Sequence, residues 1–167
     1  MNKAFVTLIF FLAALFSFSQ GKFAGPTIRK LIGKTFTDDR HIMELKGYEY
    51  REGTMITDIH DPAPLALTVL WKKNSAVIVF SGMDDTLSNI HYIVDVIEVR
   101  NILPGWDIKT VGCQYGETEG EIIVALVNPG KGEYVKAIKQ AWSCNRDKLR
   151  FETISLKKLH CINEGDD

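Results

Sequence analysis

Short apolar runs separated by turn-favouring residues are the feature that most limits what this chain can fold into. Runs rich in Val and Ile cover 65–71, 76–80, 92–99, 108–113 and 121–127. Each has the length of a strand, and most are apolar at consecutive positions, which predicts strands buried on both faces of a sheet. A parallel α/β fold needs a helical pattern of about 10–15 residues between strands. No such pattern separates these runs.

The residues between the runs indicate how the strands connect. Lys72-Lys73-Asn74-Ser75 divides two runs and predicts a hairpin, while Pro104-Gly105 and Asn128-Pro129-Gly130 mark turns. Weaker strand patterns cover 42–51 and 55–59, ahead of a polar loop. That loop is His60-Asp61-Pro62-Ala63-Pro64.

Residues 134–142 fit a helical period and a strand alternation alike. The turn residues at 145–148 and the strand-like run 149–154 favour a strand and a second hairpin. Pro26 starts a short helical pattern that Gly33 ends. We therefore predict a mainly β fold, with α+β as the alternative: a single domain with a largely antiparallel sheet and one or two short helices.

The first nineteen residues have the pattern of a secretory signal peptide. Lys3 provides a positive start, 4–18 is almost wholly apolar, and Ser17 and Ser19 are small residues at the positions that a signal peptidase reads. We place cleavage between Ser19 and Gln20, which leaves 20–167 as one exported β-rich domain. The alternative, an uncleaved anchor, needs about 20 apolar residues, and this run is shorter. We expect a periplasmic or secreted bacterial protein with no membrane span after cleavage.

The charge balance excludes one class of partner. The chain has 20 basic and 21 acidic residues and a net charge of −1. Proteins that bind nucleic acid carry a basic excess on one face or segment, and this sequence has none. We predict no nucleic-acid partner.

All three cysteines, Cys113, Cys144 and Cys161, follow the leader. In an oxidising compartment three cysteines give one disulfide and one free thiol, and their spacing does not choose among the three pairings. A zinc site formed with His160 is the rival interpretation. Such sites usually contain a close Cys-x2–4-Cys pair, which is absent here, so the spacing favours the disulfide.

Few residues indicate catalysis. The patterns of a P-loop, a nucleophile elbow and a zincin helix are all absent. His41, His60 and His91 lie near acidic residues in the sequence, but such proximity does not provide the geometry of a general base. We assign no catalytic residue, metal ligand or cofactor.

Asp95 is an acid flanked on both sides by apolar residues, in Ile93-Val94-Asp95-Val96-Ile97. A buried carboxylate must be paired, hydrogen-bonded or protonated. Its functional interpretation is an acid, a base or a ligand anchor. Its structural interpretation, which we favour, is pairing with a Lys, an Arg or a backbone N–H at a sheet edge.

Trp71, Trp106 and Trp142 are candidates for a ligand groove. We expect Trp142 in the core and Trp106, beside a turn, as the best exposed aromatic. Aromatic side chains on loops are typical of binding surfaces.

The second half resembles a group of small exported bacterial proteins of unknown function. The shared pattern is Gly112-Cys113, Glu121-Ile122-Ile123-Val124-Ala125-Leu126-Val127, Ala141-Trp142, Phe151-Glu152 and Cys161-Ile162-Asn163-Glu164-Gly165. The resemblance implies a Cys113–Cys161 disulfide with Cys144 as a free thiol. It implies no activity.

Export, small size and the absence of catalytic motifs favour a protein-binding or inhibitor-type module. We expect its partner to be an envelope or secreted protein. The alternative is a small-ligand or metal-binding periplasmic protein that uses Asp95 and the histidines, and a hydrolase comes third.

Overall fold

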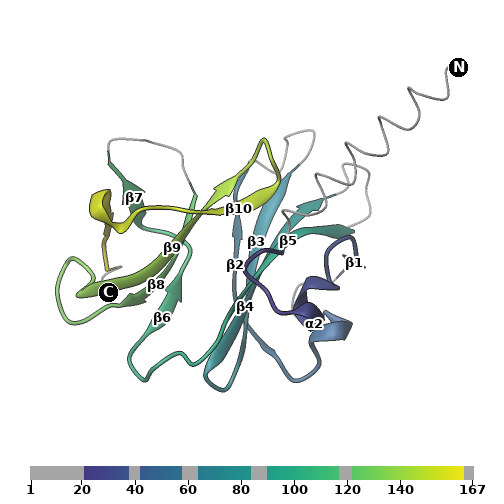
Figure 1. Ribbon diagram of the computed structural model, residues 1–167, viewed down its shortest axis with the longest axis horizontal. Helices are drawn as coiled ribbons and strands as arrows, with labels where there is room; N and C mark the ends of the chain where they lie inside the picture. The colour runs from purple at the N-terminus through teal and green to yellow at the C-terminus, as the bar shows by residue number, and fades with distance from the viewer. Residues whose placement is uncertain (1–20, 38–41, 58–63, 84–89, 117–121, 164–167) are drawn as a thin grey trace, which may run out of the picture.

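The structure is a computed structural model that describes residues 21–37, 42–57, 64–83, 90–116 and 122–163 (Figure 1). The helix is α2 (Pro26–Arg29), and the 3-10 turns are η1 (Met43–Leu45) and η2 (Leu156–Lys158). The strands are β1 (Thr35–Phe36), β2 (Glu49–Met55), β3 (Leu65–Lys72), β4 (Ser75–Met83), β5 (His91–Val99), β6 (Asp107–Lys109), β7 (Cys113–Tyr115), β8 (Ile123–Asn128), β9 (Ala137–Asn145), β10 (Arg150–Thr153) and β11 (Leu159–Cys161). The described chain is mainly β, as predicted.

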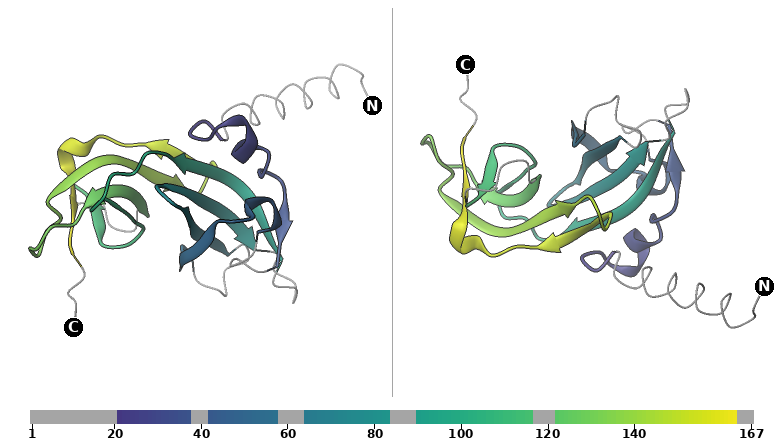
Figure 2. Two further views of the ribbon diagram at one scale, coloured as in Figure 1. Left: turned by 90° about the horizontal axis from the view of Figure 1, so that it is seen from below. Right: turned by 90° about the horizontal axis from the view of Figure 1, so that it is seen from above.

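The strands form antiparallel sheets. The first sheet has the order β1-β5-β4-β3-β2, the second has β10-β9-β8-β6, and β11 pairs with β7 in a two-stranded strap. The two larger sheets curl into a half-barrel, which is visible as an arch in Figure 2. The antiparallel arrangement confirms the predicted fold class.

Both large sheets are buried on both faces, as the apolar runs predict. Between them lies the main core, which contains Phe80 from the first sheet and Trp142 from the second. On the outer face of the first sheet, Leu31, in the turn that follows α2, and Leu45 of η1 pack against Val77 and similar residues. The strap covers the outer face of the second sheet with the side chain of Cys161 among others. Each buried Val, Leu, Ile or Phe contributes roughly 1.5–3 kcal/mol, so two-sided burial stabilises strands as short as these.

The β3–β4 hairpin forms at the predicted place. Lys72 and Ser75 are the last paired residues, which leaves Lys73 and Asn74 as the turn. Lys73 takes the left-handed conformation, with φ of 55°, and the carbonyl of Asn74 accepts a hydrogen bond from Ile102 N–H at 2.8 Å.

The ambiguous segment 134–142 is resolved as a strand. Its regular part, β9, begins at Ala137 and pairs with β8 on one side and β10 on the other. The predicted second hairpin, β9–β10, is therefore confirmed. Neighbouring strands decide between the two periods, because a pleated segment between partners satisfies its backbone groups in the sheet.

Three strand boundaries predicted from the sequence are wrong. The segment 42–51 begins with η1 and a turn, and its strand starts only at Glu49. Of 55–59, Met55 ends β2, Ile56 and Thr57 are not in a strand, and the rest lies outside the described residues, as does the polar loop up to Ala63. The run 108–113 is divided between β6 and β7, because Gly112, at φ of +72°, turns the chain toward the strap.

The short helix begins at Pro26, as predicted, and ends at Arg29. The chain then turns as far as Gly33, which has φ of +82° and donates its N–H to the carbonyl of Ile93 at 2.8 Å. No helix among the described residues has the length and apolar content needed to cross a membrane.

Candidate functional site

Asp95 lies where three chain segments meet. A bulge in the pairing of β5 with β4 leaves Val94 as an extra residue between Ile93 and Asp95. The Asp95 carboxylate, in a residue only 1% exposed, accepts hydrogen bonds from three backbone N–H groups. Gly21 and Val96 donate to Oδ1 at 2.5 and 2.9 Å, and Phe151 donates to Oδ2 at 2.7 Å. The side chain thereby joins β5 to β10 and to the segment that precedes α2.

Burial raises the pKa of Asp95 above its ordinary value, although the three amides and the charge of Arg150 act in the opposite direction. Both carboxylate oxygens already accept hydrogen bonds from backbone N–H groups. This arrangement matches the structural interpretation, in which backbone N–H groups satisfy the acid.

A disulfide joins Cys113 and Cys161, which lie directly opposite each other in β7 and β11. This is the pair that the resemblance implies, and it takes two thiolates away from the alternative zinc set. Cys144 is free and buried in β9. Burial, together with the charge of Asp95, raises the pKa of the Cys144 thiol far above its ordinary value. A thiol of this kind stays protonated and unreactive.

The histidines do not form a site in the described part of the chain. The ring of His91 stacks on the ring of Phe36, with centroids 4.8 Å apart. His160 lies beside Gln114, with Nε2 3.2 Å from Oε1. His41 and His60 lie outside the described residues, as do Ser19 and Gln20. The described residues contain no cluster of three metal-ligating side chains.

The tryptophans divide differently from the prediction. Trp142 is buried in the core, as expected. Trp106 and Trp71 are both half-buried and pack against the main core. Trp71, at the end of β3, also lines a surface cleft of about 660 Å³. We name this cleft the Trp71 cleft. Its lining residues are Gly47, Glu49, Tyr50, Arg51, Trp71, Lys72 and Lys73.

A β-bulge shapes the Trp71 cleft. Tyr50 and Glu52 pair with consecutive residues of β3, so Arg51 is the extra residue of β2. A bulge of this kind redirects a side chain relative to the sheet. The guanidinium carbon of Arg51 lies 5.1 Å from the centroid of the Trp71 ring, within the range of a cation–π contact.

The cleft is predominantly cationic. Arg51, Lys72 and Lys73 face one carboxylate of the lining, that of Glu49, which lies opposite Trp71 in the β2–β3 pairing. Lys72 Nζ lies 5.3 Å from the centroid of the Tyr48 ring. Burial, with the charge of Glu98, raises the pKa of Tyr48, so this phenol adds no negative charge at neutral pH.

An apolar pocket of about 370 Å³ adjoins the cleft, and we name it the Met43 groove. Its lining residues are Ile42, Met43, Leu45, Lys46, Gly47, Tyr48 and Leu70. The floor is buried, but Met43 is 88% exposed. Gly47 lines both the groove and the cleft.

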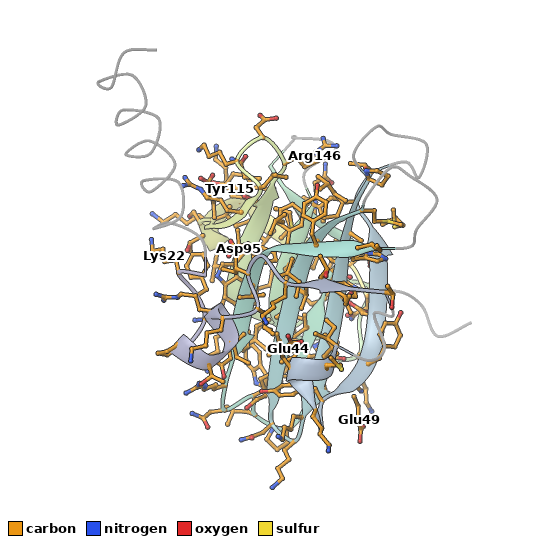
Figure 3. The ribbon with its side chains drawn as sticks, turned by 90° about the vertical axis from the view of Figure 1, so that its right-hand side faces the viewer. Lys22, Glu44, Glu49, Asp95, Tyr115 and Arg146 are labelled. Atoms are coloured by element: carbon orange, nitrogen blue, oxygen red, sulfur yellow. A yellow bond between two sulfur atoms is a disulfide. The ribbon has the colours of Figure 1, made fainter. Side chains whose placement is uncertain are left out.

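The Trp71 cleft and Asp95 are separate features. In Figure 3, Glu49 lies near the lower end of the molecule and Asp95 toward the upper left.

The indole N–H of Trp71 is buried and has no hydrogen-bond acceptor in the part of the chain that the structure describes. Leaving a buried donor without an acceptor costs roughly 1–3 kcal/mol.

The comparisons with known proteins identify no relative. No protein-family model matches the chain, and neither a curated protein nor a solved structure matches it. Function must therefore be argued from the geometry alone.

The residues of the C-terminal sequence pattern belong to the second sheet and its strap. Ala125 pairs with Ala141 across β8 and β9, and Phe151 binds Asp95 through its N–H. The Asn163 side chain donates to the carbonyls of Pro129 and Tyr134 at 2.9 and 3.3 Å, and also to that of Gly132. These residues build the second sheet and its strap, so the resemblance itself remains a prediction without an activity.

The sequence pattern names Trp71 among three candidates for a ligand groove but favours Trp106 as the exposed aromatic. It indicates only a turn at 72–75 and a strand at 42–51, so it does not predict the lysines and the bulge that form the Trp71 cleft. The available signal was a tryptophan followed by two lysines, with aromatic and cationic residues at 48–51. That signal becomes specific only once the β2–β3 pairing is known.

Proposed function

We propose that this chain is an exported protein that binds a partner protein through the Trp71 cleft and the Met43 groove. Export is supported by the signal-peptide pattern of 1–19 and by the disulfide, which is typical of oxidising compartments. The partner would then be an envelope or secreted protein, and the interaction would serve binding or inhibition.

One observation carries the proposal: an exposed apolar side chain, Met43, stands beside an apolar groove that adjoins a cleft lined by Trp71 and Arg51. Tryptophan and arginine are enriched among the residues that dominate binding energy at protein interfaces. Methionine adapts its shape to different partners. The neighbouring lysines supply a polar rim, as interfaces usually have.

Asp95 supports binding over hydrolysis. Its two oxygens are engaged by backbone amides and its residue is almost wholly buried. A general acid or base needs an oxygen within reach of the substrate. This buried acid is thus committed to the fold.

Binding of a small ligand is the second candidate. The Met43 groove, at about 370 Å³, falls in the range of roughly 300–1,000 Å³ that is usual for small-molecule sites. A small ligand would occupy the groove without needing the cleft.

Site-specific photo-crosslinking tests the proposal. A photoreactive amino acid is placed at Met43 in the full chain, which is produced with its leader in the native organism. The matched control carries it at Leu103, which is 57% exposed and lines neither pocket. We expect a protein adduct from position 43 that position 103 does not give. Adducts from neither position, or equal adducts from both, would overturn the proposal.

A further inference from the structure

The Met43 groove and the Trp71 cleft meet at Gly47, and this junction indicates what the partner presents. Gly47 has φ of +85°, a conformation that residues with a Cβ rarely adopt. A Cβ there would make only an ordinary contact, at 3.5 Å, with the flexible end of the Lys72 side chain. The groove and the cleft adjoin at this residue because Gly47 lines both of them.

We propose that the groove and the cleft form one channel for an extended segment of the partner protein. This segment carries an aliphatic side chain followed by acidic residues. The inference rests on the proposed function. The aliphatic side chain occupies the Met43 groove. The acidic residues lie over the Trp71 cleft. The channel thus recognises an acidic–apolar peptide rather than a folded surface.

Charge complementarity supports the acidic part. Three cations line the cleft against one carboxylate, and no described carboxylate lies within ion-pair distance of Arg51, Lys72 or Lys73. Arg100, by contrast, is paired with Glu98 at 2.7 Å. Arg51 and Lys72 each lie over an aromatic ring, which limits their freedom before an anion arrives. Pre-positioned cations lose less entropy when they bind a carboxylate.

The apolar part follows from the groove floor, where Ile42, Leu45 and Leu70 are buried. An aliphatic side chain there would be covered by Met43, whose three rotatable bonds suit an adjustable lid over a side chain.

Peptide binding to the full chain tests the inference. The probe is a fluorescein-labelled, blocked decapeptide with one Leu followed by three Glu in a Gly/Ser background. The comparison probes replace the three Glu by Gln, replace the Leu by Ser, or use decanoate as a free carboxylate with a tail. Binding is measured by fluorescence anisotropy, and by competition for decanoate. We expect the Gln and Ser peptides each to bind about tenfold more weakly, and binding of the Glu peptide to fall as salt rises.

Matched variants locate the binding. Arg51→Gln with Lys72→Gln should weaken the Glu peptide about tenfold and leave the weak Gln peptide unchanged. Its control is Lys139→Gln, an exposed lysine on β9. Met43→Gln should weaken both peptides that contain Leu, with Leu103→Gln as its control. Thermal melting of each variant confirms that it remains folded.

The outcomes separate this inference from the proposed function. Equal binding of the Glu and Gln peptides, or no binding of either, would overturn the acidic–apolar assignment, while a crosslinked partner at position 43 would still stand. Decanoate binding that excludes all peptides would overturn it in favour of a small amphiphile. If position 43 gives no crosslinked partner, the proposed function itself is overturned.

Discussion

At the scale of single residues, Asp95 shows how one side chain organises backbone from three places. The Asp95 carboxylate accepts the N–H groups of Gly21, which precedes α2, and of Phe151, which lies in β10. Its charge is costly to bury, which is why its pKa is raised. Burial of Asp95 favours its protonated form, whereas the three hydrogen-bond donors favour its charged form.

Asp95→Asn provides the test at this scale. The amide has one acceptor oxygen, so it can serve Gly21 and Val96 or serve Phe151, but it presents an N–H₂ group to the remaining donor. Leaving that donor unsatisfied should lower the free energy of unfolding by about 1–3 kcal/mol. Urea unfolding at pH 7 measures the loss. An unchanged midpoint would show that the three bonds contribute nothing net.

At the scale of elements, the strap of β7 and β11 depends on a covalent link. Each of its strands has three residues, and a two-stranded ribbon of that size is not stable on its own in water. The disulfide joins residues 48 positions apart and so removes much freedom from the unfolded chain. The strap in turn covers the outer face of the second sheet.

We expect Cys113→Ala with Cys161→Ala to cost about 2–5 kcal/mol of unfolding free energy. Cys144→Ala is the matched control, since it removes a buried sulfur without touching the link, and it should cost about 1 kcal/mol. Urea unfolding under non-reducing conditions gives both values. Similar costs for the two variants would contradict the role assigned to the disulfide.

The elements also show what a sequence can predict here. The β3–β4 hairpin follows from local signals, because its turn residues and apolar runs are contiguous. The division of 108–113 depends on a partner far along the chain: Ile162 donates its N–H to the carbonyl of Gly112 at 2.9 Å. The Trp71 cleft has the same character. Its bulge at Arg51 and its junction at Gly47 arise from pairing and backbone conformation, which a single sequence does not reveal.

At the scale of the whole molecule, carboxylates join the two large sheets at both margins of the half-barrel. Asp95 joins β5 to β10. At the other margin the hydroxyl of Thr110, beyond β6, donates to Glu52 of β2 at 2.7 Å and lies 3.0 Å from the hydroxyl of Thr54. Glu98 of β5 further holds the segment before α2 by accepting from Gly25 N–H at 2.9 Å. Protonation of these acidic groups should therefore change the stability of the whole fold.

The pH dependence of stability follows from the directions of three pKa shifts. Hydrogen bonds from Arg150, Lys148 and Asn145 lower the pKa of Glu152 from 4.5 to about 2. Burial opposes a lowered pKa at Glu98, but the bonds from Arg100 and Gly25 outweigh it. A group with a lowered pKa stabilises the fold above its unfolded value and loses that contribution as pH falls. Asp95 has the opposite sign, since its raised pKa means that the folded state binds its proton more readily.

We therefore expect the free energy of unfolding to fall as pH drops from about 4.5 to about 2, with the Asp95 contribution opposing part of that fall. Glu152→Gln should flatten the fall, whereas Glu133→Gln, at an exposed position outside the strands, should leave it unchanged. Urea unfolding at a series of pH values measures the slopes. High salt should also reduce the difference between wild type and Glu152→Gln, because Lys148 is half-exposed and its attraction to Glu152 is screened. Parallel slopes for the wild type and Glu152→Gln would mean that protonation of Glu152 is not coupled to folding. The loss of stability at acidic pH would then be assigned to Glu98, which holds the segment before α2.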